Sequence, residues 1–256
     1  MPAAAPKVLI SPAMAIGSGY YRPLVEAFEA RGWEARGLGR RGFERDGVRA
    51  SRRVDWSYSD EIDDLAAAVR EARAERPERP VLVLGHSLGA QLAAGHELTH
   101  EPVDGVVTVG GTLPYFRHYE YGGLPLAAMV GTVVPLTTLA LGYVPKPAFG
   151  GPGARTLMRE WARMVLTGRP PFPQTRPIDT PALLVSLEGD RLAPSPSVDA
   201  LGGLFEPDVV TRWHFAGDEV PERASTDHIA WVRTPDAIVD GVVAWWPRRT
   251  RATASR

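Results

Sequence analysis

Short apolar runs alternate with amphipathic stretches along most of this chain. The apolar runs are rich in valine, leucine and isoleucine and are short, as buried strands are. They predict strands at residues 8–10, 33–38, 81–84, 105–109, 182–187 and 209–215. The stretches between them predict helices at residues 21–31 and 57–74, from residue 90 onward and near 235–246. Such alternation is typical of a mostly parallel sheet with helices on both faces, so we expect an α/β fold.

The interval from residue 111 to residue 177 breaks this alternation, and residues 122–144 carry no charged side chain. Their length is near the ~20 residues of a membrane span. Pro125, Pro135 and several glycines and threonines interrupt the apolar character, however, and a span here would split the sheet. We therefore expect a helical cap over the carboxyl edge of the sheet, with a surface that dips into a membrane interface or a purely structural insertion as alternatives.

The expected organisation is a core of residues 1–110 and 178–247, a cap of residues 111–177 and a flexible tail of residues 248–256. The cap would form the walls of a substrate pocket. Aromatic and sulfur-containing side chains in it are the candidates for that pocket, although such residues in helices often serve only as core. They are Tyr115, Phe116, Met129 and Trp161.

Composition narrows the function classes. The chain has 256 residues, 29 basic and 30 acidic side chains and a net charge of −1, which gives no reason to expect nucleic acid as a partner. It has no cysteine, which excludes disulfides and thiolate metal sites and fits a reducing compartment. Residues 1–7 lack the apolar core of a signal peptide, so we expect a cytoplasmic protein. Arginine far outnumbers lysine and asparagine is absent, a bias that indicates a GC-rich, bacterial genome.

The strand at 81–84 runs directly into the sequence G-H-S-L-G, from Gly85 to Gly89, and a helix-forming stretch follows. A G-x-S-x-G sequence between a strand and a helix predicts a sharp turn that exposes the serine hydroxyl. Glycines at both ends allow strand and helix to pass closely. Ser87 is therefore the expected nucleophile, and the amide of Leu88 lies where it would stabilise an oxyanion.

A serine hydroxyl needs a base, and the base needs a carboxylate that orients it. On a sheet of this kind the chain order is serine, acid, histidine. His228 lies between the last strand and the last helix and is the expected base, with His214 and His86 as weaker candidates. Asp190 follows the strand at 182–187 and is the expected acid; its rivals are Glu188, Asp218 and Asp227.

The second oxyanion donor is expected in the loop after the first strand. Pro12 has no amide hydrogen, so the amide of Ala13 or that of Met14 is the candidate.

Residues His96 to His100 read H-E-L-T-H, a pattern that binds zinc on some helices. They come at the far end of the helix that follows Ser87, at roughly 14–20 Å along its axis, and no third ligand is evident. We interpret them as a frayed helix end with basic residues near the negative pole of the helix dipole, and expect neither a metal nor another cofactor.

With these residues in place, the chain resembles the α/β-hydrolase superfamily over nearly its whole length, and in particular a subgroup of bacterial serine hydrolases. The features that carry the resemblance are Ser11-Pro12-Ala13-Met14, Gly19-Tyr20-Tyr21-Arg22-Pro23-Leu24, Gly39-Arg40-Arg41-Gly42, the G-H-S-L-G turn, Gly142-Tyr143-Val144-Pro145 and Asp227-His228-Ile229-Ala230-Trp231. The resemblance implies a Ser87–His228–Asp190 triad and a cap inserted between core strands. The chain departs from many relatives at Ser11-Pro12, where His-Gly is common, and at Ala90, where a second glycine is common.

The function expected from these residues is hydrolysis of a small ester or thioester with a hydrophobic acyl part, through an acyl-enzyme on Ser87. Transfer of the acyl group to an alcohol or amine, in an acyltransferase or cyclase, would use the same triad if the cap excludes water. A binding protein that reuses the fold without catalysis is the third alternative.

Overall fold

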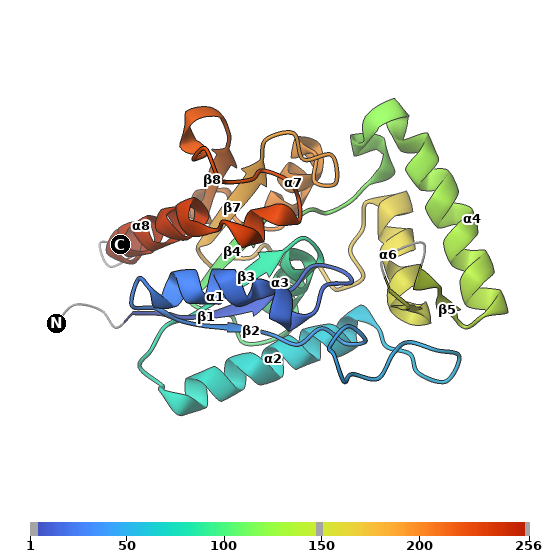
Figure 1. Cartoon of the computed structure of the whole chain (residues 1–256), viewed down its shortest axis with the longest axis horizontal. Helices are drawn as coiled ribbons and strands as arrows, with labels where there is room; N and C mark the ends of the chain where they lie inside the picture. The colour runs from blue at the N-terminus through green and yellow to red at the C-terminus, as the bar shows by residue number, and fades with distance from the viewer. Residues whose placement is uncertain (1–4, 147–150, 254–256) are drawn as a thin grey trace.

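The computed structural model describes residues 5–146 and 151–253 of the chain. Six of the strands in this range form one sheet in the order β2-β1-β3-β4-β7-β8, and every neighbouring pair is parallel (Figure 1). The strands are β1 (Lys7–Ser11), β2 (Glu34–Gly37), β3 (Val81–His86), β4 (Gly105–Val109), β7 (Ala182–Leu187) and β8 (Val210–Phe215). The α/β fold expected from the sequence is confirmed, with all six predicted strands present.

Helices cover both faces of the sheet (Figure 1). They are α1 (Arg22–Glu29), α2 (Tyr58–Glu75), α3 (Leu88–Thr99), α7 (Ser195–Gly202) and α8 (Asp236–Thr253). Alternate residues of each strand enter opposite cores: Leu82 and Leu84 pack with α1 and α8, whereas Val81 and Val83 pack with α2 and α3. Because successive side chains point to opposite faces and helices cover both faces, the central strands are continuous apolar runs in the sequence.

Local sequence sets some of the helix ends. Ser57 caps α2 in a capping box with Asp60, which donates its backbone amide to Ser57 and accepts the amide of Ser57 in return. Helix α8 continues through Thr253, beyond the boundary at residue 247 expected from the sequence, because arginine is a strong helix former and does not end a helix.

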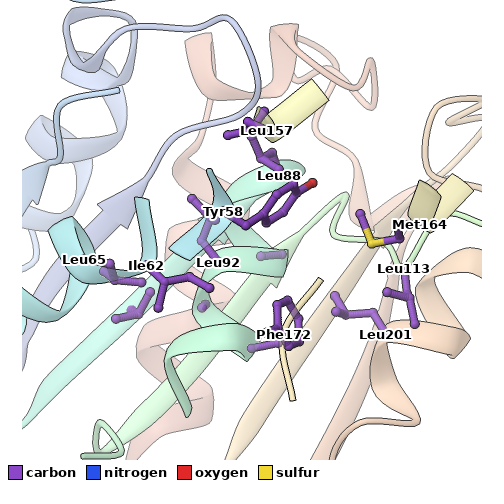
Figure 2. Close-up of a cluster of buried hydrophobic side chains, with 14 of the residues drawn as sticks. Tyr58, Ile62, Leu65, Leu88, Leu92, Leu113, Leu157, Met164, Phe172 and Leu201 are labelled. Atoms are coloured by element: carbon purple, nitrogen blue, oxygen red, sulfur yellow. The ribbon is translucent and has the colours of Figure 1, made fainter. Parts of the chain in front are cut away.

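The insertion between β4 and β7 contains helices α4 (Leu124–Ala140) and α6 (Arg155–Thr167) and the two-stranded antiparallel pair β5 (Tyr143–Val144) and β6 (Gly153–Ala154). Helices α4 and α6 pack against each other beyond one end of the sheet (Figure 1). Leu157 and Met164 of α6 belong to the same apolar cluster as Ile62 and Leu92, so the insertion shares the core of one sheet face (Figure 2).

The chain also forms short 3₁₀ helices between these elements. They are η1 (Ser18–Tyr21), η2 (Phe116–His118), η3 (Glu120–Gly123), η4 (Pro207–Val209), η5 (Gly217–Glu219) and η6 (Ala230–Arg233).

Candidate active site

Ser87 occupies a strained turn between β3 and α3. Its φ of 53° and ψ of −114° lie outside the regions that a residue with a side chain normally adopts, at a cost on the order of 1–3 kcal/mol. The flanking glycines make the turn possible, because a Cβ on Gly89 would lie 2.0 Å from the carbonyl oxygen of Ser11. A Cβ on Gly85 would lie 2.5 Å from the Cα of Ala90. The turn predicted from the glycines and serine is therefore present, and its backbone is held against the loop after β1.

The side chains of Ser87, His228 and Asp190 form a continuous hydrogen-bonded series. His228 Nε2 lies 3.0 Å from Ser87 Oγ, and His228 Nδ1 lies 2.6 Å from Asp190 Oδ2. With Nδ1–H donating to the carboxylate, Nε2 is left to accept the serine proton. The Asp190 side chain is 1% exposed, and its Oδ1 accepts the amides of Leu192 and Ala193, each at 2.9 Å. These amides fix the carboxylate that orients the histidine.

The rival acids and bases have other partners. Asp227 Oδ1 accepts the amides of Ile229 and Ala230 at the start of a short turn, and Glu188 accepts the amide of Gly217. His214, on the last strand β8, is exposed, and its Nδ1 lies 2.9 Å from Oγ of Ser186 on the neighbouring strand β7. Asp218 lies on the short helix η5. The structure brings only Asp190 and His228, of the candidates, into one series with Ser87.

His86, beside the nucleophile, has a different place in the site. Its ring is fully buried and bridges two distant segments: Nδ1 lies 2.7 Å from Tyr21 Oη, and Nε2 lies 2.7 Å from the carbonyl oxygen of His228. Since a carbonyl only accepts, Nε2–H donates and Nδ1 accepts the tyrosine proton. Burial, together with the nearby His228, lowers the pKa of His86 to about 3, so the ring is neutral at ordinary pH.

The same tyrosine separates the two candidates for the second oxyanion donor. The amide of Ala13 donates to Tyr21 Oη at 2.7 Å, and burial raises the pKa of this tyrosine, which keeps its hydroxyl protonated. Because the amide of Ala13 already has this buried partner, it is not free to hold an oxyanion. Met14 is the candidate that remains beside Leu88.

A buried ion pair holds the loop that carries Met14. The Arg40 guanidinium donates to the carbonyl oxygen of Pro12 and pairs with Glu61, whose other oxygen accepts Trp56 Nε1–H at 2.9 Å. The side chains of Arg40 and Glu61 are 3% and 6% exposed. Removing either partner would leave an uncompensated buried charge, so the pair fixes the loop after β1.

Met14 and Leu88 line one small cavity. Its volume of about 10 Å³ has room for about one water molecule. Its lining is predominantly apolar and comes from both the core and the insertion: Met14, Ala15, Arg40, Phe43, Trp56, Glu61, Leu88, Gly151, Gly153, Ala154, Leu157 and Met158.

A family model described as serine aminopeptidase, S33, matches residues 2–148, more than half of the chain. The chain belongs to this family. Its members are α/β hydrolases, which confirms the resemblance inferred from the sequence. No curated protein matches the chain.

Solved structures share the fold along nearly the whole S33-family chain. A monoacylglycerol lipase from Paleococcus ferrophilus has a TM-score of 0.61 at 17% identity, with 94% of this chain and 96% of that chain covered. A structure from work on the metagenome-derived lipolytic enzymes LipS and LipT has a TM-score of 0.66 at 15% sequence identity, with 97% of this chain and 99% of that chain covered. The esterase EaEST from Exiguobacterium antarcticum has a TM-score of 0.63 at 12% sequence identity, with 95% of this chain and 92% of that chain covered. At these identities the similarity establishes the α/β-hydrolase fold.

The pocket residues expected from the sequence of this S33-family chain lie elsewhere in the insertion. Phe116, Met129 and Trp161 pack against the main apolar cluster, and Tyr115 makes an edge contact with Phe116 at 5.0 Å between ring centroids. None of the four lines the cavity beside Leu88. Their role as pocket residues stays a prediction.

Sequence reasoning missed the side chains that do line this cavity. Phe43 and Trp56 come from the loop between β2 and α2, and no local pattern marks them. Leu157 and Met158 belong to the buried face of the amphipathic helix α6. The apolar spacing of that helix was the one available signal.

The H-E-L-T-H segment packs into the core instead of fraying. Glu97 is 1% exposed, and its carboxylate accepts the Val103 amide and the Thr180 hydroxyl. His96 is also buried, and His100 lies 3.2 Å from Asp63 at the end of the helix. The frayed helix end predicted from the sequence is therefore wrong. The loop after α3 buries Glu97, and the spacing of residues along one helix does not reveal such a contact. Among residues 5–146 and 151–253, no group of three or more histidine or acidic side chains is arranged to hold a metal ion.

Proposed function

We propose that this S33-family protein hydrolyses esters or thioesters with a hydrophobic acyl part through an acyl-enzyme on Ser87. The observation that supports the proposal most directly is the hydrogen-bonded series Asp190–His228–Ser87 at a strained turn. A serine held in this way exchanges its proton with the imidazole and attacks a carbonyl carbon.

In the first half of the reaction, Ser87 Oγ bonds to the acyl carbon while His228 Nε2 accepts the serine proton. The negative charge that develops on the carbonyl oxygen is stabilised by the amides of Leu88 and Met14. His228 then donates its proton to the leaving alcohol or thiol, and the acyl-enzyme forms. The Asp190 carboxylate, bonded to His228 Nδ1, stabilises the charged imidazole.

In the second half, a water molecule attacks the acyl-enzyme as His228 removes its proton. The second tetrahedral intermediate collapses, the acid leaves, and the proton returns to Ser87. The apolar side chains of Phe43, Leu157 and Met158 beside Leu88 support an acyl group without charge. Because the cavity between them has room for about one water molecule, only a short acyl end fits without displacing them.

The name of the matching family refers to peptides, whereas the groups that line the cavity beside Leu88 favour an ester as the substrate. An aminopeptidase binds the ammonium group of a peptide and needs an unpaired carboxylate near the nucleophile. Glu61 is the acidic side chain that lines the cavity, and it is already paired with Arg40 and bonded to Trp56. The similar structures include a lipase and an esterase, proteins named for ester cleavage.

A fluorophosphonate probe tests the nucleophile. We expect the probe to label the wild-type protein on Ser87 and the Ser87→Ala variant not at all. His228→Ala should lower turnover of a p-nitrophenyl ester by several orders of magnitude with little change in thermal stability, because the triad acts as a unit. The His214→Ala variant is the matched control and should keep its activity. Labelling of Ser87→Ala at the wild-type rate would refute the mechanism.

Product analysis tests the reaction class. Hydrolysis predicts that mass spectrometry finds the free acid as the acyl product, even in the presence of added alcohols and amines. Transfer of the acyl group to these acceptors in preference to water would assign the protein to the acyltransferases instead.

A further inference from the structure

Helix α4 differs from the other α-helices that the structure describes in having no charged residue. Only Val130, Val134 and Thr138 are buried among its residues, and they form the single stripe that packs towards α6. The exposed positions are Leu124, Pro125, Ala128, Gly131, Thr132, Val133, Pro135, Leu136, Leu139 and Ala140. Leu124, Leu136 and Leu139 are 68%, 64% and 78% exposed. A helix that is apolar on every side is normally covered on every side.

The segment Glu120–Ala140 is long and apolar enough for a membrane span, and only 22% of an apolar 18-residue stretch in it is buried. Its attachment argues against a span, because α4 packs along α6 and both of its ends continue into the fold (Figure 1). A helix held in this way lies along a surface instead of crossing it.

The threonines of α4 have the hydrogen bonding expected in an apolar environment. Thr132 Oγ1 donates to the carbonyl oxygen of Ala128 at 2.6 Å, and Thr137 Oγ1 donates to that of Val133 at 2.6 Å. Because each hydroxyl bonds within the helix, its donor needs no water. The exposed face therefore offers methyl groups and satisfied hydroxyls.

The size of the face favours a lipid surface over a second protein. Helix α4 has 17 residues, which corresponds to a strip ~26 Å long and ~10 Å wide, or ~260 Å². A stable protein interface buries about 800 Å² on each partner. The strip is too small to hold a second copy alone, whereas a bilayer accepts an apolar helix of any size.

Aromatic and cationic groups flank the two ends of the strip. Tyr121, just before α4, is 83% exposed, and Arg117 is exposed with its guanidinium 5.5 Å from the ring centre of Phe116. At the other end, Arg52 donates to the carbonyl oxygen of Ala140, and Arg53 beside it is exposed. Tyrosine and arginine at the borders of an apolar helix are suited to the headgroup layer of an anionic membrane.

We propose that the exposed face of α4 lies on the surface of a lipid bilayer that carries anionic headgroups. The leucines would enter the acyl boundary, and Arg52, Arg53 and Arg117 would contact lipid phosphates. This binding does not depend on the proposed ester hydrolysis, so each can fail without the other.

Co-sedimentation of the full chain with phosphatidylcholine vesicles containing phosphatidylglycerol tests the proposal. We expect the wild-type protein to bind, and the double variant Leu136→Glu/Leu139→Glu to bind at least ~10-fold more weakly, a change of ~1.4 kcal/mol. The matched control is Ala67→Glu/Ala74→Glu, which adds the same charge at exposed positions of α2 and should bind as the wild type does. A Leu136→Ser/Leu139→Ser variant removes the apolar groups without adding charge and should also bind weakly. Circular dichroism checks that all variants are folded.

The arginines predict a second result. The variant Arg53→Gln should bind phosphatidylglycerol vesicles about fivefold more weakly, while its binding to pure phosphatidylcholine vesicles is unchanged. Wild-type protein that stays in the supernatant, or leucine variants that bind as tightly as the wild type, would overturn the proposal. So would sedimentation equilibrium that finds a wild-type dimer and a monomeric Leu136→Glu/Leu139→Glu variant, since a second copy would then cover the face.

Discussion

His86 should make the stability of the protein depend on pH in a way that a neutral substitute removes. Its buried ring is neutral in the folded state, with a pKa lowered to about 3 by burial, while the unfolded chain has the ordinary value of 6.5. Below about pH 6.5 the unfolded chain takes up a proton at this residue and the folded protein does not. The contribution of His86 to stability is therefore complete above the unfolded pKa and is lost as the pH falls towards the folded pKa.

The magnitude follows from linkage. Between about pH 7 and about pH 5, this one histidine should lower the free energy of unfolding by ~2 kcal/mol, because each pKa unit is worth ~1.4 kcal/mol and the folded state stays unprotonated throughout. That loss is a large share of the 5–15 kcal/mol that is typical of folded proteins.

Urea unfolding at the two pH values measures the effect. The variant His86→Gln keeps one donor for the His228 carbonyl and one acceptor for the Tyr21 hydroxyl, but it does not titrate. Between these two pH values its free energy of unfolding should therefore fall by ~2 kcal/mol less than that of the wild type. The exposed His214→Gln is the matched control and should retain the wild-type dependence. Equal losses in the wild type and His86→Gln would refute the assignment of His86 as a buried neutral ring.

Other positions of the site give further predictions. A Cβ at Gly110, whose φ is +57°, would lie 3.1 Å from His228 Nδ1, so Gly110→Ala should lower kcat for a p-nitrophenyl ester at least ~10-fold by displacing the base; an unchanged kcat would contradict this. Met14 takes the second position of the turn closed by Ile16 N and Ala13 O, where proline is favoured, so Met14→Pro deletes the amide hydrogen in a compatible turn. Its kcat should fall ~10²–10³-fold with little change in KM, while Met14→Ala, which keeps the amide, serves as control; equal kcat values would exclude this amide from the oxyanion hole. Met158→Ala should enlarge the cavity beside Leu88, lower the free energy of unfolding by ~2–5 kcal/mol and shift kcat/KM towards longer acyl chains. A chain-length profile identical to that of the wild type would place the acyl group elsewhere.

The sheet and the hydrogen-bonded series could be predicted because they depend on local order along the chain. Each predicted catalytic or oxyanion residue follows a strand whose apolar run is legible in the sequence, and the carboxyl ends of parallel strands meet at one edge. The glycines around Ser87 mark the turn without any knowledge of distant contacts. For this reason the sequence alone points to Ser87, Asp190 and His228, which the structure joins by hydrogen bonds.

The choice of the oxyanion donor needed the folded molecule. Tyr21 occupies the amide of Ala13, and nothing in the sequence near Ala13 indicates that contact. The lining of the small cavity beside Leu88 was not predicted for a similar reason, since Phe43 and Trp56 reach it from an irregular loop. Glu97 resembled a metal-site residue only while its buried partners were unknown. In each case the partner is a hydrogen bond or contact in the folded chain that no local sequence pattern indicates.

The position of His228 in the chain has a consequence for how activity develops during folding. Strands β1 to β4 lie side by side in the sheet, and β7 and β8 add to one edge in chain order. The hydrogen bonds from Ser87 to His228 and from His86 to the His228 carbonyl span 141 and 142 residues. A growing or refolding chain therefore carries Ser87 in its turn long before the base arrives, and contacts of such sequence separation form late. The rate at which the fluorophosphonate probe becomes reactive should report the completion of folding, later than any signal from the helices.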